Sequence, residues 1–73
     1  MLNKVFQLIT KILEMNKIRT KGGYISEQPQ EIILLFDYDS NTYPLTRFLE
    51  KCQIPFQLDA DKTTNFKCVN IYF

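Results

Sequence analysis

Apolar residues in the first part of the chain recur at the three- and four-residue spacing of an amphipathic helix. They are Leu2, Val5, Phe6, Ile9, Ile12 and Leu13. The pattern predicts one helix over residues 2–17 whose apolar stripe packs on the protein core. The alternatives are an interfacial membrane helix or a targeting presequence. Lys4 and Lys11 interrupt the stripe, so it is too short to cross a bilayer and we expect no membrane partner.

The pattern then changes from helical to extended. Gly22-Gly23 predicts a break, and its flanks, residues 17–21 and 24–27, have strand character. Gln28-Pro29-Gln30 predicts a turn, because proline drives the preceding residue toward extended backbone. Residues 31–38 form an almost unbroken apolar run, which predicts a buried strand.

A second helix is predicted after a polar loop over residues 37–42. It begins near Tyr43-Pro44, since proline suits the first helical turn, and it ends at Ile54-Pro55. Its predicted buried residues are Leu45, Phe48, Leu49 and Cys52.

Two more strands are predicted in the last third of the chain. Phe56–Leu58 is short, and the proline before it favours an edge position. A polar turn over residues 59–65 leads into a strand over residues 66–73. Alternation places Val69, Ile71 and Phe73 on one face of that strand, with Phe66, Cys68, Asn70 and Tyr72 on the other.

The predicted fold is α+β, with two helices on one face of a four-stranded, mostly antiparallel sheet in α-β-β-α-β-β order. Moving the last strand to the front gives the split βαβ plan, so we expect a circularly permuted ferredoxin-like sandwich with the C-terminal strand central. At 73 residues the chain is expected to be a single domain, residues 1–73.

Composition narrows the classes of function. Net charge is +1, whereas nucleic-acid binders usually carry a clear basic excess. Cys52 and Cys68 are the only cysteines and the chain has no histidine, so we expect two reduced thiols and no structural zinc. A disulfide between them is the alternative. These features, with no secretion signal recognised, predict a cytoplasmic protein.

The segment Ile33–Thr42 resembles the first motif of haloacid-dehalogenase-type phosphatases, in which an apolar strand leads into Asp-x-Asp. The resemblance implies Asp37 as nucleophile and Asp39 as acid/base. The sequence departs from the motif at Ser40, which stands where the motif has glycine, and one extra residue precedes Thr42. The later residues that complete the Mg²⁺ site are not found, so we expect no enzymatic activity and no cofactor.

Asp37, Asp39 and Asn41 also occupy positions 1, 3 and 5 of a calcium-loop pattern. Thr42 and Phe48 stand where that pattern needs glycine and glutamate, so no metal site is expected. The polar side chains of this loop are expected to bind its own backbone amides and those of the helix that follows.

Aromatic residues provide the main functional hypothesis. Phe66 and Tyr72 are expected on the helix-free face of the sheet, and one alternation of the neighbouring strand adds Phe36 and Tyr38. Asp37, Asp39 and Asn41 are expected at the rim of that face. An uncovered aromatic surface is typical of protein contacts. We therefore expect a non-catalytic protein-binding module, an inhibitor or regulator of a larger host enzyme or complex, as found among phage and mobile-element accessory proteins.

Two alternatives remain open. The same aromatics could stack nucleic-acid bases, with a basic rim of Lys17, Arg19, Lys21 and Lys67, in a single-stranded RNA-binding module. The chain could also form a homodimer through the sheet face or through an edge strand such as Phe56–Leu58.

Overall fold

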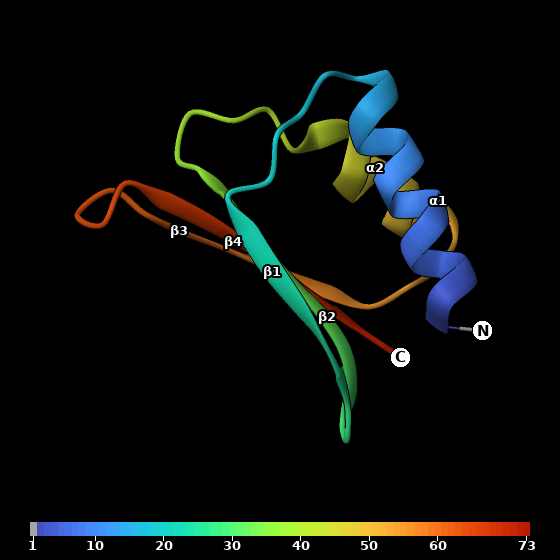
Figure 1. The fold of residues 1–73 in the computed structure, drawn as a ribbon. Coiled ribbons are helices and arrows are strands. Elements are labelled where there is room, and N and C mark those ends of the chain that lie inside the picture. The colour runs from blue at the N-terminus through green and yellow to red at the C-terminus, as the bar shows by residue number, and fades with distance from the viewer. Residues whose placement is uncertain (1) are drawn as a thin grey trace.

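Two helices lie over one face of a four-stranded antiparallel sheet (Figure 1). This is a computed structural model, and it describes residues 2–73. The elements are α1 (Leu2–Met15), β1 (Gly22–Glu27), β2 (Gln30–Asp37), α2 (Tyr43–Lys51), β3 (Phe56–Asp61) and β4 (Phe66–Tyr72). The predicted α-β-β-α-β-β order and α+β class are confirmed.

The strands are arranged in the order β1-β2-β4-β3, and every neighbouring pair is antiparallel. The C-terminal strand β4 is central, as predicted, and β1 and β3 form the two edges. This order is consistent with a circular permutation of the ferredoxin-like plan. The edge strand predicted at Phe56–Leu58 continues to Asp61, so the polar turn after it is shorter than the sequence suggested.

One layer of side chains between the helices and the sheet forms the core. It consists of Ile9, Leu13, Leu45 and Leu49 from the helices, with Ile32, Leu34, Phe36, Val69 and Ile71 from the central strands. The apolar stripe of the first helix therefore packs inward as predicted. The side chain of Leu2, which the sequence places on that stripe, lies outside the described residues.

The first helix ends at Met15, two residues before its predicted end, because Lys17 adopts a left-handed backbone with φ 55°. The N–H of Ile18 donates to the Leu13 carbonyl oxygen at 2.8 Å, and the N–H of Lys17 donates to the Glu14 carbonyl oxygen at 3.1 Å. These two bonds make a Schellman motif, in which the residue after the helix is usually glycine. Because this position holds lysine instead of glycine, the sequence carried no glycine signal for the end of the helix.

Helix α2 ends in the same way around Gln53, whose φ is 56°. The N–H of Ile54 donates to the Leu49 carbonyl oxygen at 2.9 Å. In both motifs an isoleucine follows the left-handed residue and packs against the core. Each helix is thus closed by a hydrophobic contact that turns the chain back toward the sheet.

The glycine pair predicted as a break lies inside β1, and residues 17–21 are not a strand. At Gly23, a Cβ atom would lie 2.5 Å from the backbone oxygen of Ile33 on the neighbouring strand. At Gly22, no atom lies within 4 Å of an added Cβ. Only the second glycine is therefore required by close approach of two backbones.

The two glycines offer a matched test of the β1–β2 pairing. Gly23→Ala is expected to lower the free energy of unfolding by about 1–3 kcal/mol, because the contact is with backbone that cannot rotate away. Gly22→Ala is expected to leave that free energy unchanged or raise it by about 0.4–1 kcal/mol through the unfolded state. Urea unfolding followed by circular dichroism measures both. Equal effects of the two substitutions would contradict this register.

Candidate functional site: the open face of the sheet

The face of the sheet turned away from the helices carries the candidate site. Strand alternation and register assign its positions, because residues opposite each other on paired strands share a face. We call this set the open face: Gly22, Tyr24, Ser26, Glu31, Ile33, Leu35, Asp37, Gln57, Asp59, Asp61, Phe66, Cys68, Asn70 and Tyr72. A hydrogen bond from the Tyr72 hydroxyl to Gln57 Oε1, at 3.3 Å, links two of its strands.

Burial confirms the alternation in β4. Val69 and Ile71 are fully buried beneath the helices, whereas Cys68, Asn70 and Tyr72 are half-buried and Phe66 is 40% exposed. The predicted assignment of Phe66 and Tyr72 to the helix-free side is therefore correct. Phe73 follows the last strand residue and is 43% exposed, so it does not share the burial of Val69 and Ile71.

A shallow hollow of about 270 Å³ lies on this face beside the β3–β4 hairpin. Its lining residues are Leu35, Asp59, Ala60, Asp61, Thr64, Phe66 and Cys68. Leu35, Phe66 and Cys68 provide apolar surface, and two carboxylates stand beside them. Apolar surface next to an anion matches a lysine or arginine side chain, whose methylene stem is apolar and whose head is cationic.

The two carboxylates at the hollow are held by short-range contacts. Asp61 Oδ1 accepts a hydrogen bond from the Thr63 N–H at 2.9 Å, which also fixes the hairpin turn. Asp59 Oδ1 accepts a longer bond, 3.4 Å, from Gln57 Nε2. Both aspartates are exposed, so they remain available to a cation from solvent.

The charge of the open face has one sign. Among the strand residues, all of which the structure describes, the charged residues at open-face positions are Glu31, Asp37, Asp59 and Asp61. The rest of the chain then holds nine basic and four acidic side chains, which leaves it at +5. A nearly neutral protein is thus divided into an acidic sheet face and a basic remainder.

The thiol of Cys68, on the open face, has a pKa that depends on its surroundings. Burial and, to a smaller extent, the Asp59 carboxylate raise the pKa of its thiol above the ordinary value. Its Sγ donates a hydrogen bond to Asn70 Oδ1 at 2.9 Å. Both cysteines are free, as predicted. The prediction that Cys52 lies on the buried face of the second helix is wrong: α2 ends at Lys51, and Cys52 caps it with an exposed side chain.

The expectation that Phe36 lies on the open face is wrong. Phe36 is opposite Lys67 in the β2–β4 register and is fully buried under the helices. Tyr38 follows the end of β2, where its N–H donates to the Asn65 carbonyl oxygen at 3.1 Å, so it is not a strand position of this face. The apolar run of β2 offered no internal contrast by which to choose between the two alternations.

Ile33 and Leu35 take the places predicted for those aromatics, and both are half-buried. A signal for the correct choice was present at the two ends of the run. Glu31 and Asp37 are separated by an even number of positions and must share a face. Charged residues belong on the exposed side, so they mark the odd-numbered residues of β2 as the open set.

The basic residues predicted as a rim around the aromatic side chains are divided between the two sides of the sheet. Lys67 is half-buried, and its Nζ donates to the Ser40 carbonyl oxygen at 2.8 Å, on the helix side of the sheet. Lys21 Nζ lies 3.7 Å from Asp37 Oδ1 in an exposed ion pair. Lys67 therefore does not stand on the open face beside the aromatics, whereas Lys21 reaches Asp37 at the end of that face, and the nucleic-acid alternative stays a prediction.

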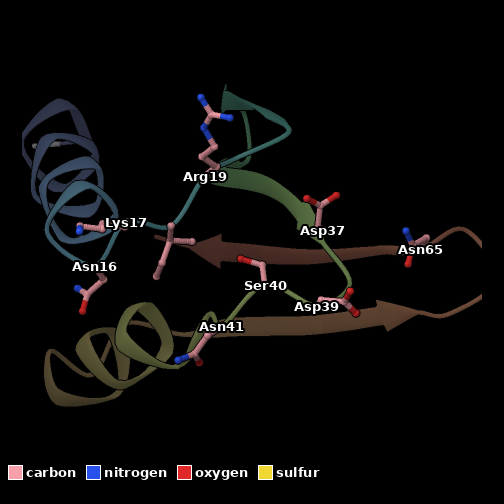
Figure 2. A pocket seen from close by; sticks show the side chains of 9 residues that line it. Asn16, Lys17, Arg19, Asp37, Asp39, Ser40, Asn41 and Asn65 are labelled. Atoms are coloured by element: carbon pink, nitrogen blue, oxygen red, sulfur yellow. The ribbon is translucent and has the colours of Figure 1, made fainter.

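The remaining predicted site residues gather at one end of the sheet (Figure 2). Asp37, Asp39, Asn41, Lys17 and Arg19 all line a polar pocket of about 540 Å³ between the end of α1, the β2–α2 loop and the β3–β4 hairpin. In Figure 2 the two aspartates lie near the end of β2, and Lys17 lies on the α1 side. Three polar residues expected for protein contact and two basic residues expected for nucleic acid thus share one exposed pocket of mixed charge.

The β2–α2 loop is held by backbone and side-chain hydrogen bonds. Asn41 Oδ1 accepts the Tyr43 N–H at 3.1 Å, which confirms the predicted role of this residue at the helix entrance. The Ser40 N–H donates to the Asp37 carbonyl oxygen at 3.0 Å. Within residues 2–73, no three His, Cys, Asp or Glu side chains are placed to share a metal ion.

None of the helices in the described part of the chain combines the length and apolar character needed to span a bilayer. Comparison of the chain with protein-family models, curated proteins and solved structures finds no significant match. Function is therefore inferred from the residues and their geometry.

Two phenylalanines test the division of β2 and β4 into a buried and an open face. Phe36→Ala is expected to cost about 3–5 kcal/mol, because it empties a fully buried site. A core of this size supplies on the order of 3–5 kcal/mol, so the variant should be largely unfolded at 25 °C. Phe66→Ala is expected to remain folded. Circular dichroism and urea titration distinguish them, and similar losses for both would contradict the assignment.

The Cys68 thiol offers a pH measurement at the open face. In a Cys52→Ser background, the midpoint of the pH–rate curve for alkylation by iodoacetamide should lie higher in the folded chain than in urea, because the folded pKa is raised. Asp59→Asn removes the smaller cause and should lower the folded midpoint, whereas Glu50→Gln on α2 should not change it. A folded midpoint at or below the unfolded one would refute the described environment.

Proposed function

We propose that the chain is a small protein-binding module whose open face binds an apolar, basic surface of another protein. The observation that carries this proposal is the hollow at Phe66, where apolar side chains adjoin Asp59 and Asp61. A lysine or arginine of the partner would lay its stem over Phe66 and Leu35 and direct its cation to the carboxylates. Apolar residues of the partner would cover the half-buried centre of the face.

Charge supports this class of partner over nucleic acid. The acidic strand positions surround the aromatic side chains and would repel a phosphate backbone, while they attract lysine and arginine. The centre of the face is apolar and aromatic, which is the usual composition of the energetic centre of a protein interface. We propose that such binding inhibits or regulates a larger enzyme or complex in the cytoplasm, where free thiols stay reduced.

A randomised short-peptide library tests the proposal without a known partner. Selection against the immobilised chain is expected to enrich peptides that combine lysine or arginine with aromatic or aliphatic residues. Binding of a selected peptide, measured by fluorescence anisotropy, should weaken about tenfold for the Asp59→Asn/Asp61→Asn double variant, since two attractive contacts are lost. Phe66→Ala should weaken it at least as much. Glu50→Gln on α2 is the matched charge control and should bind normally.

Two results would count against the proposal. One is the enrichment of acidic peptides. A related result is that a bound peptide shifts the backbone-amide NMR signals of the helices of the chain instead of those of β2, β3 and β4. The other is tight binding of a single-stranded oligonucleotide that falls steeply with added salt, which would indicate phosphate contacts. Peptide binding itself should fall only moderately with salt, because its apolar part is not screened.

A further inference from the structure

The β1 edge of the sheet is unprotected. It lies at one end of the strand order, and its residues are exposed except for a half-buried Ser26. Edge strands are usually blunted by proline, by charged side chains along the edge or by a bulge, because their free N–H and C=O groups can pair with another strand. Gly22–Glu27 contains no proline, and its register with β2 runs without interruption from end to end.

The opposite edge, β3, carries such protection. Pro55 precedes its first residue, and Asp59 and Asp61 point to the open face. Two copies of β3 would bring four carboxylates of one sign onto a short seam. Like charges placed opposite each other destabilise strand pairing, so this edge disfavours self-association. The two edges of the sheet therefore differ in what they can pair with.

We propose that β1 pairs antiparallel with β1 of a second copy, so that two sheets join into one of eight strands. Alternation restricts the register, because opposite residues must share a face if both copies keep their helices on the same side. Three registers meet this condition near the middle of the strand, and they place Gly23, Tyr24 or Ile25 on the two-fold axis. Within β1 the registers centred on Tyr24 and on Ile25 each pair five residues, 22–26 and 23–27. We choose the register centred on Tyr24, because it also brings Lys21, which directly precedes the strand, opposite Glu27 of the other copy.

That register is complementary in charge. It places Lys21 of each copy opposite Glu27 of the other, so the two-fold axis generates two ion pairs. Lys21 already contacts Asp37 at 3.7 Å, but both side chains of that pair are about half exposed. An exposed pair of this kind contributes little, so redirecting Lys21 costs little.

The register is also complementary in shape. Ile25, which is 37% exposed in the single chain, falls opposite Gly23 of the second copy on the helix-covered side. Gly23 has no side chain and pairs with Leu34, which lines an apolar groove under α1. Tyr24, which is 62% exposed in the single chain, lies opposite Tyr24 of the second copy on the open face. Each apolar side chain of β1 therefore gains a neighbour.

Sedimentation equilibrium over a range of concentrations tests the proposal. The 8.7 kDa chain is expected to approach twice that mass as concentration rises. Lys21→Glu alone and Glu27→Lys alone should each weaken the dimer about tenfold, because both ion pairs become like-charge contacts. The double variant Lys21→Glu/Glu27→Lys should restore it, which loss of folding would not do. Lys11→Glu, an equal charge change on α1, is the control and should dimerise normally.

Several results would overturn the proposed β1–β1 dimer. A mass that stays at one chain up to millimolar concentration overturns the proposal. A dimer that both single variants leave intact also overturns the proposal. So does failure of the double variant to restore the dimer, because Lys21 and Glu27 are then not paired across the interface. Slower amide exchange in β1 at high concentration, with β3 unchanged, would support it. Since no partner peptide is present, these outcomes are independent of those for the open face.

Discussion

The pairing of β2 with β4 is the constraint on which the rest of the structure depends. Leu34 lies opposite Val69 and Ile32 opposite Ile71, so that the two central strands present one continuous apolar layer to the helices. A shift of one residue would exchange the faces of an entire strand. With a core of this size little stability would remain after such an exchange, so the register is strongly selected. The composition of the open face is a consequence of the same register.

The division of charge between the open face and the rest of the chain follows from the β2–β4 register. Four of the five acidic strand residues fall on the open face, and the fifth, Glu27, ends β1 on the other side. The basic residues are distributed over the helices, the links and the hairpin turn, except for Lys67 on the helix side of β4. A net charge of +1 conceals this separation. A surface of one sign orients an approaching partner and disfavours ligands of the same sign, even where its contribution to affinity is modest.

Several features of this chain show a local sequence signal overridden by context. Lys17 and Gln53 adopt the left-handed backbone that usually requires glycine, and the isoleucine after each packs on the core. Gly23, in contrast, has ordinary backbone angles and is needed because a neighbouring carbonyl is too close for any side chain. In each case packing between elements, and not local preference, fixes the backbone.

Local patterns by themselves determined the two helices, the strands β2, β3 and β4, the fold class and the inward and outward residues of β4, because those patterns repeat along the chain. The sequence predicted β1 only in part, because its glycine pair indicated a break. Phe66 and Tyr72 could be assigned to the exposed side from sequence on that basis. For the alternation of β2, and so for Phe36, the sequence held only the charged ends Glu31 and Asp37 as a signal, and the register with β4 decided it. Tertiary structure alone decided the meeting of Asp59 and Asp61 with Leu35 at one hollow. A uniformly apolar strand looks the same from both faces until a neighbouring strand fixes its register. Only then do residues distant in sequence share a surface.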